Sequence, residues 1–300
     1  MSSLTENWTE NILLFAAPVF LLMLVLELLT YRYLSDDSEL GYQAKDTATS
    51  LSMGLGFLGV EAGWKLVTVG AYVAAYELTP LRLSPESPWT WVLLFFADDF
   101  FYYCYHRSHH EVRILWASHV VHHSSERYNF STALRQPWTP FTALPFWLPL
   151  ALIGIPPWMI MLQISINLAY QFFLHTERID KLPRWFEWVF NTPSHHRVHH
   201  GIQAPYLDRN YGGILILWDR LFRTFEPERE RVVYGLTTNV GSFNPVRVAF
   251  HEYAAIGRDL RSARSWRDRA GHLLRGPGWM PGPPTAKATG PLAEASQPAG

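Results

Sequence analysis

Three short stretches of the sequence concentrate histidine: His106-Arg-Ser-His109-His110, His119-Val-Val-His122-His123 and His196-Arg-Val-His199-His200. Residues three or four positions apart share one face of an α-helix, so the imidazoles of each stretch are expected to converge. Neutral imidazole is a common metal ligand and suits iron, zinc and copper. Most of the 13 histidines of the chain lie in such runs. The pattern therefore predicts a site for two metal ions rather than scattered, solvated surface histidines.

Five apolar runs surround these stretches, although the mean hydropathy of the whole chain is only −0.03. They cover residues 11–29, 49–76, 89–105, 141–153 and 158–173. A helix needs about 20 predominantly apolar residues to cross a bilayer. The last two runs flank Gly154-Ile155-Pro156-Pro157, which predicts a helical hairpin with a turn set by proline. We therefore predict an all-α, multi-pass integral membrane helical bundle with a histidine-rich cap, rather than the buried helices of a soluble protein.

The distribution of positive charge predicts how this bundle is oriented. The histidine-bearing regions 106–135 and 176–248 are rich in arginine, whereas residues 1–11 and the turn 154–157 contain neither lysine nor arginine. Positive loops remain on the cytoplasmic side of a membrane. We therefore expect all three histidine runs on the cytoplasmic face, in a bacterial inner membrane or the endoplasmic reticulum.

Charge and cysteine content exclude several classes of function. The net charge of −1 gives no electrostatic reason to expect nucleic acid as a partner. The single cysteine, Cys104, excludes an intrachain disulfide, a cysteine-ligated iron–sulfur cluster and a cysteine-rich zinc site. The stretch Gly54-Leu-Gly56-Phe-Leu-Gly59 matches a dinucleotide fingerprint only as text, because no strand precedes it. Gly59 and Gly63 are instead predicted to allow close helix packing.

Histidine coordination without thiolate favours zinc or a redox metal that binds O2. The hydrolytic zinc motif His-Glu-x-x-His is absent, since His110-Glu111 continues as Val112-Arg113. Three runs also supply more ligands than one four-coordinate zinc needs, so two irons fit better. Carboxylates often orient metal-binding imidazoles by accepting their second N–H. The candidates for this role are Asp99, Glu111, Glu126, Asp208 and Asp219.

The three runs resemble the histidine boxes of the integral-membrane fatty acid hydroxylase and sterol desaturase superfamily, whose members are non-haem di-iron oxygenases. The sequence is similar in particular to the alkylglycerol monooxygenase branch. That similarity is carried by Trp116-Ala-Ser-His119, Ser124-Ser-Glu126, Phe173-Leu-His175-Thr-Glu177, Asn191-Thr-Pro-Ser-His195, Tyr211-Gly-Gly and Trp218-Asp219-Arg220. It extends over roughly residues 90–280.

The resemblance implies two irons and the residues that bind them. The implied ligands are His106, His110, His119, His122, His123, His196, His199 and His200, with His175 as a ninth. His109 and His195 fall outside the box spacing, so they are expected beside the ligands. His251 and His272 lie outside the pattern altogether and are expected at the surface.

The resemblance also implies a reaction and its partners. The expected enzyme hydroxylates a lipid C–H bond with O2 and cleaves glycerol ether lipids with tetrahydrobiopterin or another external reductant. An external electron donor is expected because the sequence has no flavin fingerprint or haem-binding motif. One alternative is a sterol or fatty-acyl hydroxylase or desaturase that receives electrons from an external cytochrome or ferredoxin. An alternative from a different class is a membrane metal transporter, whose sites tend to lie near the bilayer midplane.

These features predict three parts of the chain. Residues 1–90 are expected to form N-terminal transmembrane helices, and residues 91–248 a catalytic domain of the fatty acid hydroxylase type. Residues 249–300 are expected to form a C-terminal tail, disordered in its last, Pro/Gly/Ala-rich part. Within the catalytic domain, Leu182–Phe190 reads as a short interfacial helix.

Overall fold

The computed structural model describes residues 12–34 and 40–282. These residues form helices and no strands, apart from two isolated β-bridges, which confirms the all-α prediction. The helices are α2 (Ile12–Leu34), α3 (Ala44–Glu77), α4 (Pro88–Glu111), α5 (Arg113–His123), α6 (Phe130–Ala133), η1 (Pro140–Thr142), α7 (Leu144–Leu152), α8 (Pro157–Phe172), α9 (Arg184–Val189), α10 (Pro193–His199), α11 (Leu217–Phe222), α12 (Pro245–Ser262) and α13 (Trp266–Leu274).

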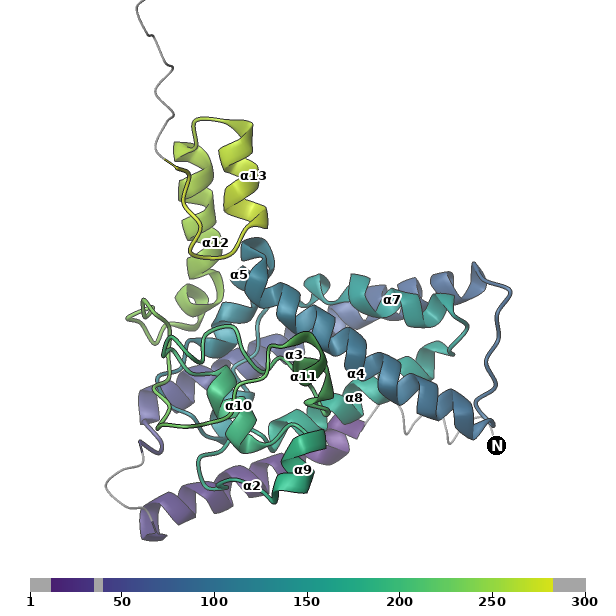
Figure 1. Ribbon diagram of the computed structural model, residues 1–300, viewed down its shortest axis with the longest axis horizontal. Helices are drawn as coiled ribbons and strands as arrows, with labels where there is room; N and C mark the ends of the chain where they lie inside the picture. Colours follow the sequence, from purple (N-terminus) through teal and green to yellow (C-terminus); the bar gives the residue numbers. More distant parts are fainter. Residues whose placement is uncertain (1–11, 35–39, 283–300) are drawn as a thin grey trace, which may run out of the picture.

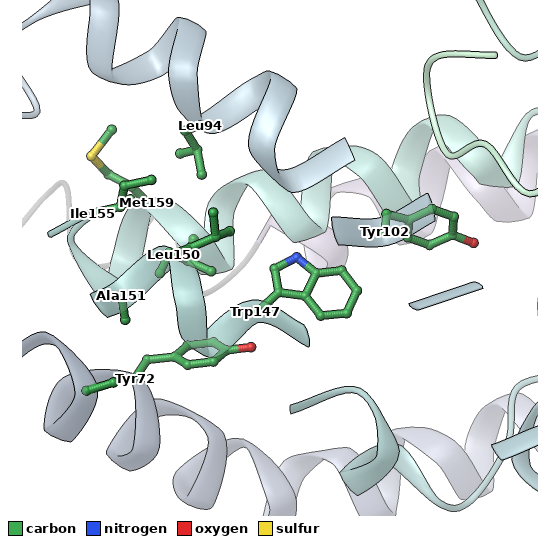
Figure 2. Packing of buried hydrophobic residues seen from close by; sticks show 10 residues of the cluster. Tyr72, Leu94, Tyr102, Trp147, Leu150, Ala151, Ile155 and Met159 are labelled. Atoms are coloured by element: carbon green, nitrogen blue, oxygen red, sulfur yellow. The ribbon is translucent and has the colours of Figure 1, made fainter. Parts of the chain in front are cut away.

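The long helices α2, α3 and α4 pack with α7 and α8 in one bundle (Figure 1). Figure 2 shows the core between α3, α4, α7 and α8, where Tyr72, Leu94 and Trp147 are buried together. The predicted hairpin is present as α7 and α8. Its turn needs glycine, because Gly154 has φ +90° and a Cβ there would lie 2.7 Å from the carbonyl oxygen of Leu81.

The outer face of the bundle is apolar, and Leu22, Leu55 and Leu66 are more than half exposed. One described segment, Ala16–Leu34, is long and apolar enough to cross a membrane by itself, and only 11% of its most apolar part is buried. Helix α7 has 9 residues and α8 has 16, fewer than the roughly 20 that a full crossing requires. Length and composition therefore support one candidate span among the five predicted apolar runs.

Two glycines of the stretch that resembles a dinucleotide fingerprint, Gly54 and Gly56, determine how closely α3 approaches its neighbours. A Cβ at Gly54 would lie 2.8 Å from the carbonyl oxygen of Leu134, and one at Gly56 would lie 2.4 Å from the Trp138 ring. By contrast, a Cβ at Gly59 or Gly63 would meet nothing within 4 Å. The prediction of close packing at Gly59 and Gly63 was therefore wrong, because the crowded face of α3 is one turn earlier.

The histidine runs lie at one end of the bundle, where the C-terminal end of α4 meets α5 and α10 (Figure 1). Helices α12 and α13 form a second hairpin, which packs on α5 and projects from the bundle. Residues 249–274, predicted as part of a tail, are thus largely helical. The predicted disorder falls mostly on residues 283–300, which lie outside the described residues.

Candidate metal centre

Nine imidazoles converge at this end of the bundle in two groups, each with ligand nitrogens within 4.8 Å of one another. The first pocket is formed by His106, His110, His119, His123 and His199. The second pocket is formed by His122, His175, His196 and His200. All nine side chains are buried. The structure thus brings together every residue of the predicted ligand set.

Each of the two later runs is divided between the pockets, contrary to the expectation that each run shares one side. On α5, His119 and His123 point into the first pocket and His122 into the second. A helix turns about 100° per residue, so residues four apart differ by only about 40°, while adjacent residues differ by about 100°. The same rotation directs His196 and His200 into the second pocket and His199 into the first. Both α5 and α10 therefore serve both pockets.

Backbone carbonyl groups fix the orientation of three imidazoles. The Nδ1–H of His106 donates to the carbonyl oxygen of Tyr211 at 2.9 Å, and that of His199 to Arg209 at 2.9 Å. His175 donates in the same way to Gln171 at 2.8 Å. A carbonyl only accepts, so Nδ1 holds the proton and Nε2 presents its lone pair to the pocket.

Of the predicted carboxylate partners, Asp208 lies beside an imidazole, whereas Asp99 and Asp219 bind backbone N–H groups. Asp208 approaches a pocket histidine, with 3.5 Å between its Oδ1 and His110 Nδ1. Asp99 instead accepts hydrogen bonds from the backbone N–H groups of Ile214 and Leu215, at 2.7 and 3.1 Å. Asp99, one of the candidates for orienting an imidazole, does not do so for His106, whose Nδ1–H donates to the Tyr211 carbonyl oxygen.

Asp219 stabilises the segment that supplies two of these carbonyl groups. It is fully buried and accepts from the N–H groups of Tyr211 and Gly212 at 2.8 and 2.7 Å, and from the Thr224 hydroxyl at 2.7 Å. Burial raises the pKa of Asp219 to about 6, against the opposing effect of these donors. In the same segment, Asp208 and Asn210 have φ values of 58° and 56°, a left-handed conformation that is costly outside glycine.

Burial also keeps the imidazoles neutral. It lowers the pKa of His175 to about 4, and the pKa values of His119, His122 and His199 fall well below the usual range for the same reason, reinforced by the neighbouring imidazoles. Desolvation disfavours the charged form of a base, so the nitrogens are free to act as ligands at neutral pH.

The remaining histidines divide into two kinds. His109 and His195 are buried outside the two pockets, and His109 Nδ1 donates to the carbonyl oxygen of Tyr105 at 2.8 Å. His251 is partly exposed. His272 is 4% exposed, 3.4 Å from a guanidinium nitrogen of Arg113, so its predicted surface position was wrong. His272 is buried because α13 packs on α5, and no local pattern in the sequence predicts that packing.

Sequence reasoning missed two supports of the second pocket. The ring of Tyr128 stacks on His175 with 5.6 Å between centroids, and its hydroxyl donates to the carbonyl oxygen of Leu174 at 2.9 Å. Thr176, next to His175, donates to the buried carboxylate of Glu27 in α2. The position of Glu27 within an apolar helix was the sequence feature that could have predicted this contact, because a buried carboxylate needs hydrogen-bond partners.

Fold and site together define an all-helical protein with a polyhistidine centre that could hold two metal ions. The "Fatty acid hydroxylase" family model matches residues 91–224. Residues 91–224 are therefore similar to the fatty acid hydroxylase family. No solved structure matches the chain.

Two groups of curated relatives are similar to this chain. It is 41% identical over 271 residues to alkylglycerol monooxygenase of Homo sapiens, which covers 90% of this chain and 60% of that protein. It is 42% identical over 271 residues to alkylglycerol monooxygenase of Danio rerio, again covering 90% of this chain and 60% of that protein. The ornithine lipid hydroxylase OlsE of Rhizobium tropici is 30% identical over 152 residues, covering 47% of this chain and 44% of that protein. The chain therefore spans about 60% of the length of the alkylglycerol monooxygenases.

Proposed function

We propose that this protein is a membrane-bound non-haem di-iron monooxygenase that hydroxylates the carbon next to the ether oxygen of a glycerol ether lipid. The observation that carries the proposal is the pair of adjacent pockets, lined by nine buried imidazoles. Relatives at 41–42% identity named alkylglycerol monooxygenase support this choice of substrate class.

The spacing of the imidazole nitrogens fits ligands of a shared metal ion. In the first pocket, His119 Nε2 lies 2.9 Å from His106 Nε2 and 3.1 Å from His123 Nε2. In the second, His175 Nε2 lies 3.0 Å from His122 Nε2 and 3.1 Å from His196 Nε2. With metal–nitrogen bonds of about 2.1 Å, right angles between ligands give about 3.0 Å and tetrahedral angles about 3.4 Å. The observed separations are therefore close to those expected for neighbouring ligands of one metal ion.

Unpartnered nitrogens in both pockets also fit a bound metal. His110 Nε2 and His200 Nε2 are buried and have no hydrogen-bond partner among the described residues. A buried polar atom without a partner is costly unless something else compensates it. We assign one metal to each pocket, with five ligands in the first pocket and four in the second.

Two irons held by these imidazoles would, with O2, two electrons and two protons, supply the oxidising power for inserting one oxygen atom into a C–H bond. The residues of the chain bury the reacting carbon, exclude water and hold the imidazoles neutral and oriented. Hydroxylation next to the ether oxygen gives a hemiacetal, which separates into an aldehyde and a glycerol derivative, and the second oxygen atom leaves as water. Tetrahydrobiopterin or another external reductant supplies the electrons.

The proposed membrane position follows from the apolar outer surface of the helices. The segment Ala16–Leu34 is a candidate span, and the histidine pockets lie at the arginine-rich end of the bundle. By the positive-inside rule we assign this end to the cytoplasmic face. The alkyl chain would then lie between helices with its polar end near the pockets. Metal transport is less well supported, because the pockets are at one end of the bundle rather than at its middle.

A second candidate is hydroxylation of an acyl lipid, with electrons from an external cytochrome or ferredoxin. The observation in its favour is the similarity to the ornithine lipid hydroxylase of Rhizobium tropici. The two candidates share the pockets and differ in substrate and reductant.

The test is an assay of membranes that contain the protein, with an alkylglycerol, O2 and a tetrahydropterin. Fatty aldehyde formed only when both O2 and pterin are present is the expected result. Turnover of an acyl lipid or sterol with a ferredoxin or cytochrome donor, without turnover of alkylglycerol, would replace the first candidate by the second. Membranes containing the His199→Ala variant serve as the matched control.

A further inference from the structure

The α12–α13 hairpin projects from the bundle on the side of the histidine pockets (Figure 1). Arg113 of α5 fastens it, with salt bridges of 2.7 Å to Glu252 and 2.6 Å to Asp259 of α12. On its remaining surface, Val246, Trp266 and Leu274 are more than half exposed. The hairpin is therefore available for another role.

Arginine dominates the charge of this hairpin. Residues 245–282 contain no lysine and seven arginines: Arg247, Arg258, Arg261, Arg264, Arg267, Arg269 and Arg275. They contain three acidic residues, and Arg113 engages two of these, Glu252 and Asp259. Asp268 is the one acidic residue left to balance the arginines. The hairpin is thus strongly cationic on a chain whose net charge is −1.

A groove of about 1010 Å³ runs along the hairpin between α12, α13 and residues 276–282. Arg264, Arg267 and Arg275 line it together with Asp259, which pairs with Arg113, and Asp268. None of the three arginines forms a salt bridge within the described residues. Trp279 lies on the same groove, with the Arg275 guanidinium 5.7 Å from its ring centroid. Guanidinium groups recognise phosphate through two parallel N–H donors, so three in one groove suit a phosphate ester.

Exposed apolar side chains lie on the same hairpin: Leu274 and Met280 line the groove, and Trp266 lines a separate hollow with Arg261 and Arg269. Trp266 is 80% exposed, Met280 73% and Leu274 63%. The Arg269 guanidinium lies 4.9 Å from the Trp266 ring centroid, so an indole and a cation are presented together. Tryptophan with arginine around an apolar edge is typical of a surface that lies at the headgroup level of a membrane. A soluble phosphate compound would make no use of these apolar side chains.

We propose that the α12–α13 hairpin binds the phosphate headgroup of an anionic phospholipid in the groove of Arg264, Arg267 and Arg275, with Trp266, Leu274 and Met280 in the membrane interface. The inference rests on the membrane location proposed above and is independent of the metal chemistry. The hairpin fastens the histidine end of the bundle to the lipid surface from which the substrate comes.

Native mass spectrometry of the full chain in a neutral detergent tests this assignment, with phosphatidylglycerol and phosphatidylcholine as probes. Replacing three arginines that face an anionic lipid is expected to weaken binding by roughly a hundredfold. The test variant is Arg264→Gln, Arg267→Gln and Arg275→Gln combined. The matched control combines Arg184→Gln, Arg229→Gln and Arg231→Gln, which removes the same charge elsewhere. Metal content is measured on the same samples.

The expected result is preferential binding of phosphatidylglycerol that the hairpin variant loses and the control retains, with unchanged metal content in both. Equal binding of the two lipids, or equal loss in the two variants, would overturn the proposal. Inorganic phosphate and glycerol 3-phosphate form a further arm. Competition by either as effective as that of the lipid would make this a site for a soluble phosphate and overturn the lipid assignment. A protein without metal that still binds phosphatidylglycerol would contradict the proposed function and leave the hairpin assignment standing.

Discussion

The two histidine pockets share their ligand-bearing helices but differ in what supports them. Helices α5 and α10 contribute to both pockets. The first pocket is supported by the Arg209 and Tyr211 carbonyl groups, which Asp219 holds in place. The second is supported by Tyr128 and by the contact between Thr176 and Glu27 of α2. Replacing a ligand should therefore disable the whole centre, whereas replacing a support should weaken one pocket.

The largest effect is expected from removing a ligand. His122→Ala in the second pocket and His199→Ala in the first should each lower lipid turnover by at least about a hundredfold, because ligand loss exceeds the 10–100-fold effect typical of outer-shell partners. The measurement is aldehyde release from alkylglycerol. His251→Ala is the control and should retain activity. Full turnover by either pocket variant would show that its pocket takes no part in the reaction.

Acid should destabilise the metal-free protein through both pockets. Burial lowers the pKa of His175 from 6.5 to about 4, so the unfolded chain takes up a proton more readily than the folded one. The stability this imidazole contributes is complete above pH 6.5 and is lost as pH falls toward 4, a loss of about 3 kcal/mol for this group. Thermal melting of metal-free protein between pH 7.5 and 4.5 measures this loss. If the melting temperature stayed constant as the pH was lowered from 6.5, the claim that the buried imidazoles are neutral would be contradicted.

Asp219→Ala should weaken the first pocket selectively. The change leaves two backbone N–H groups and the Thr224 hydroxyl without their acceptor, which frees the segment that carries the Arg209 and Tyr211 carbonyl groups. Metal affinity of the first pocket should fall about 10–100-fold. Metal affinity is measured by competitive chelator titration. The same titration of the His199→Ala variant shows which metal ion belongs to the first pocket. Equal weakening of both pockets would mean that their supports are not separate.

Glu27→Ala is the corresponding change for the second pocket, with a smaller expected effect because it acts through Thr176 rather than on a histidine. The Phe130 N–H, which donates to Glu27 at 2.8 Å, also loses its acceptor. Metal affinity of the second pocket should fall by about tenfold or less. Glu27→Gln preserves volume and one acceptor oxygen, so it should lie between Glu27→Ala and the wild type in the same chelator titration. A fall in metal affinity confined to the first pocket would contradict the assignment of Glu27 as a support of the second pocket.

The composition of the centre was predictable from the sequence, but its internal arrangement was harder to predict. Run spacing and the similarity around His175 identified all nine imidazoles, because these signals are local. The division of the two later runs between two pockets follows from helix rotation and could have been predicted. The carbonyl partners of His106 and His199 could not have been predicted, because every residue has a backbone carbonyl group and its identity does not show which one accepts. The contact between Glu27 and Thr176, 149 residues apart, depends on tertiary packing in the same way.

The total metal content of the purified protein tests the central claim most directly. Anaerobic purification followed by elemental mass spectrometry should give two metal ions per chain, one for each pocket. Counting all metals is necessary because zinc competes with ferrous iron for such ligands. Two ions in the wild type, with at least one lost in both His110→Ala and His200→Ala, is the predicted result. A folded wild-type protein with one ion or none, or a count unchanged in both variants, would contradict the two-pocket centre.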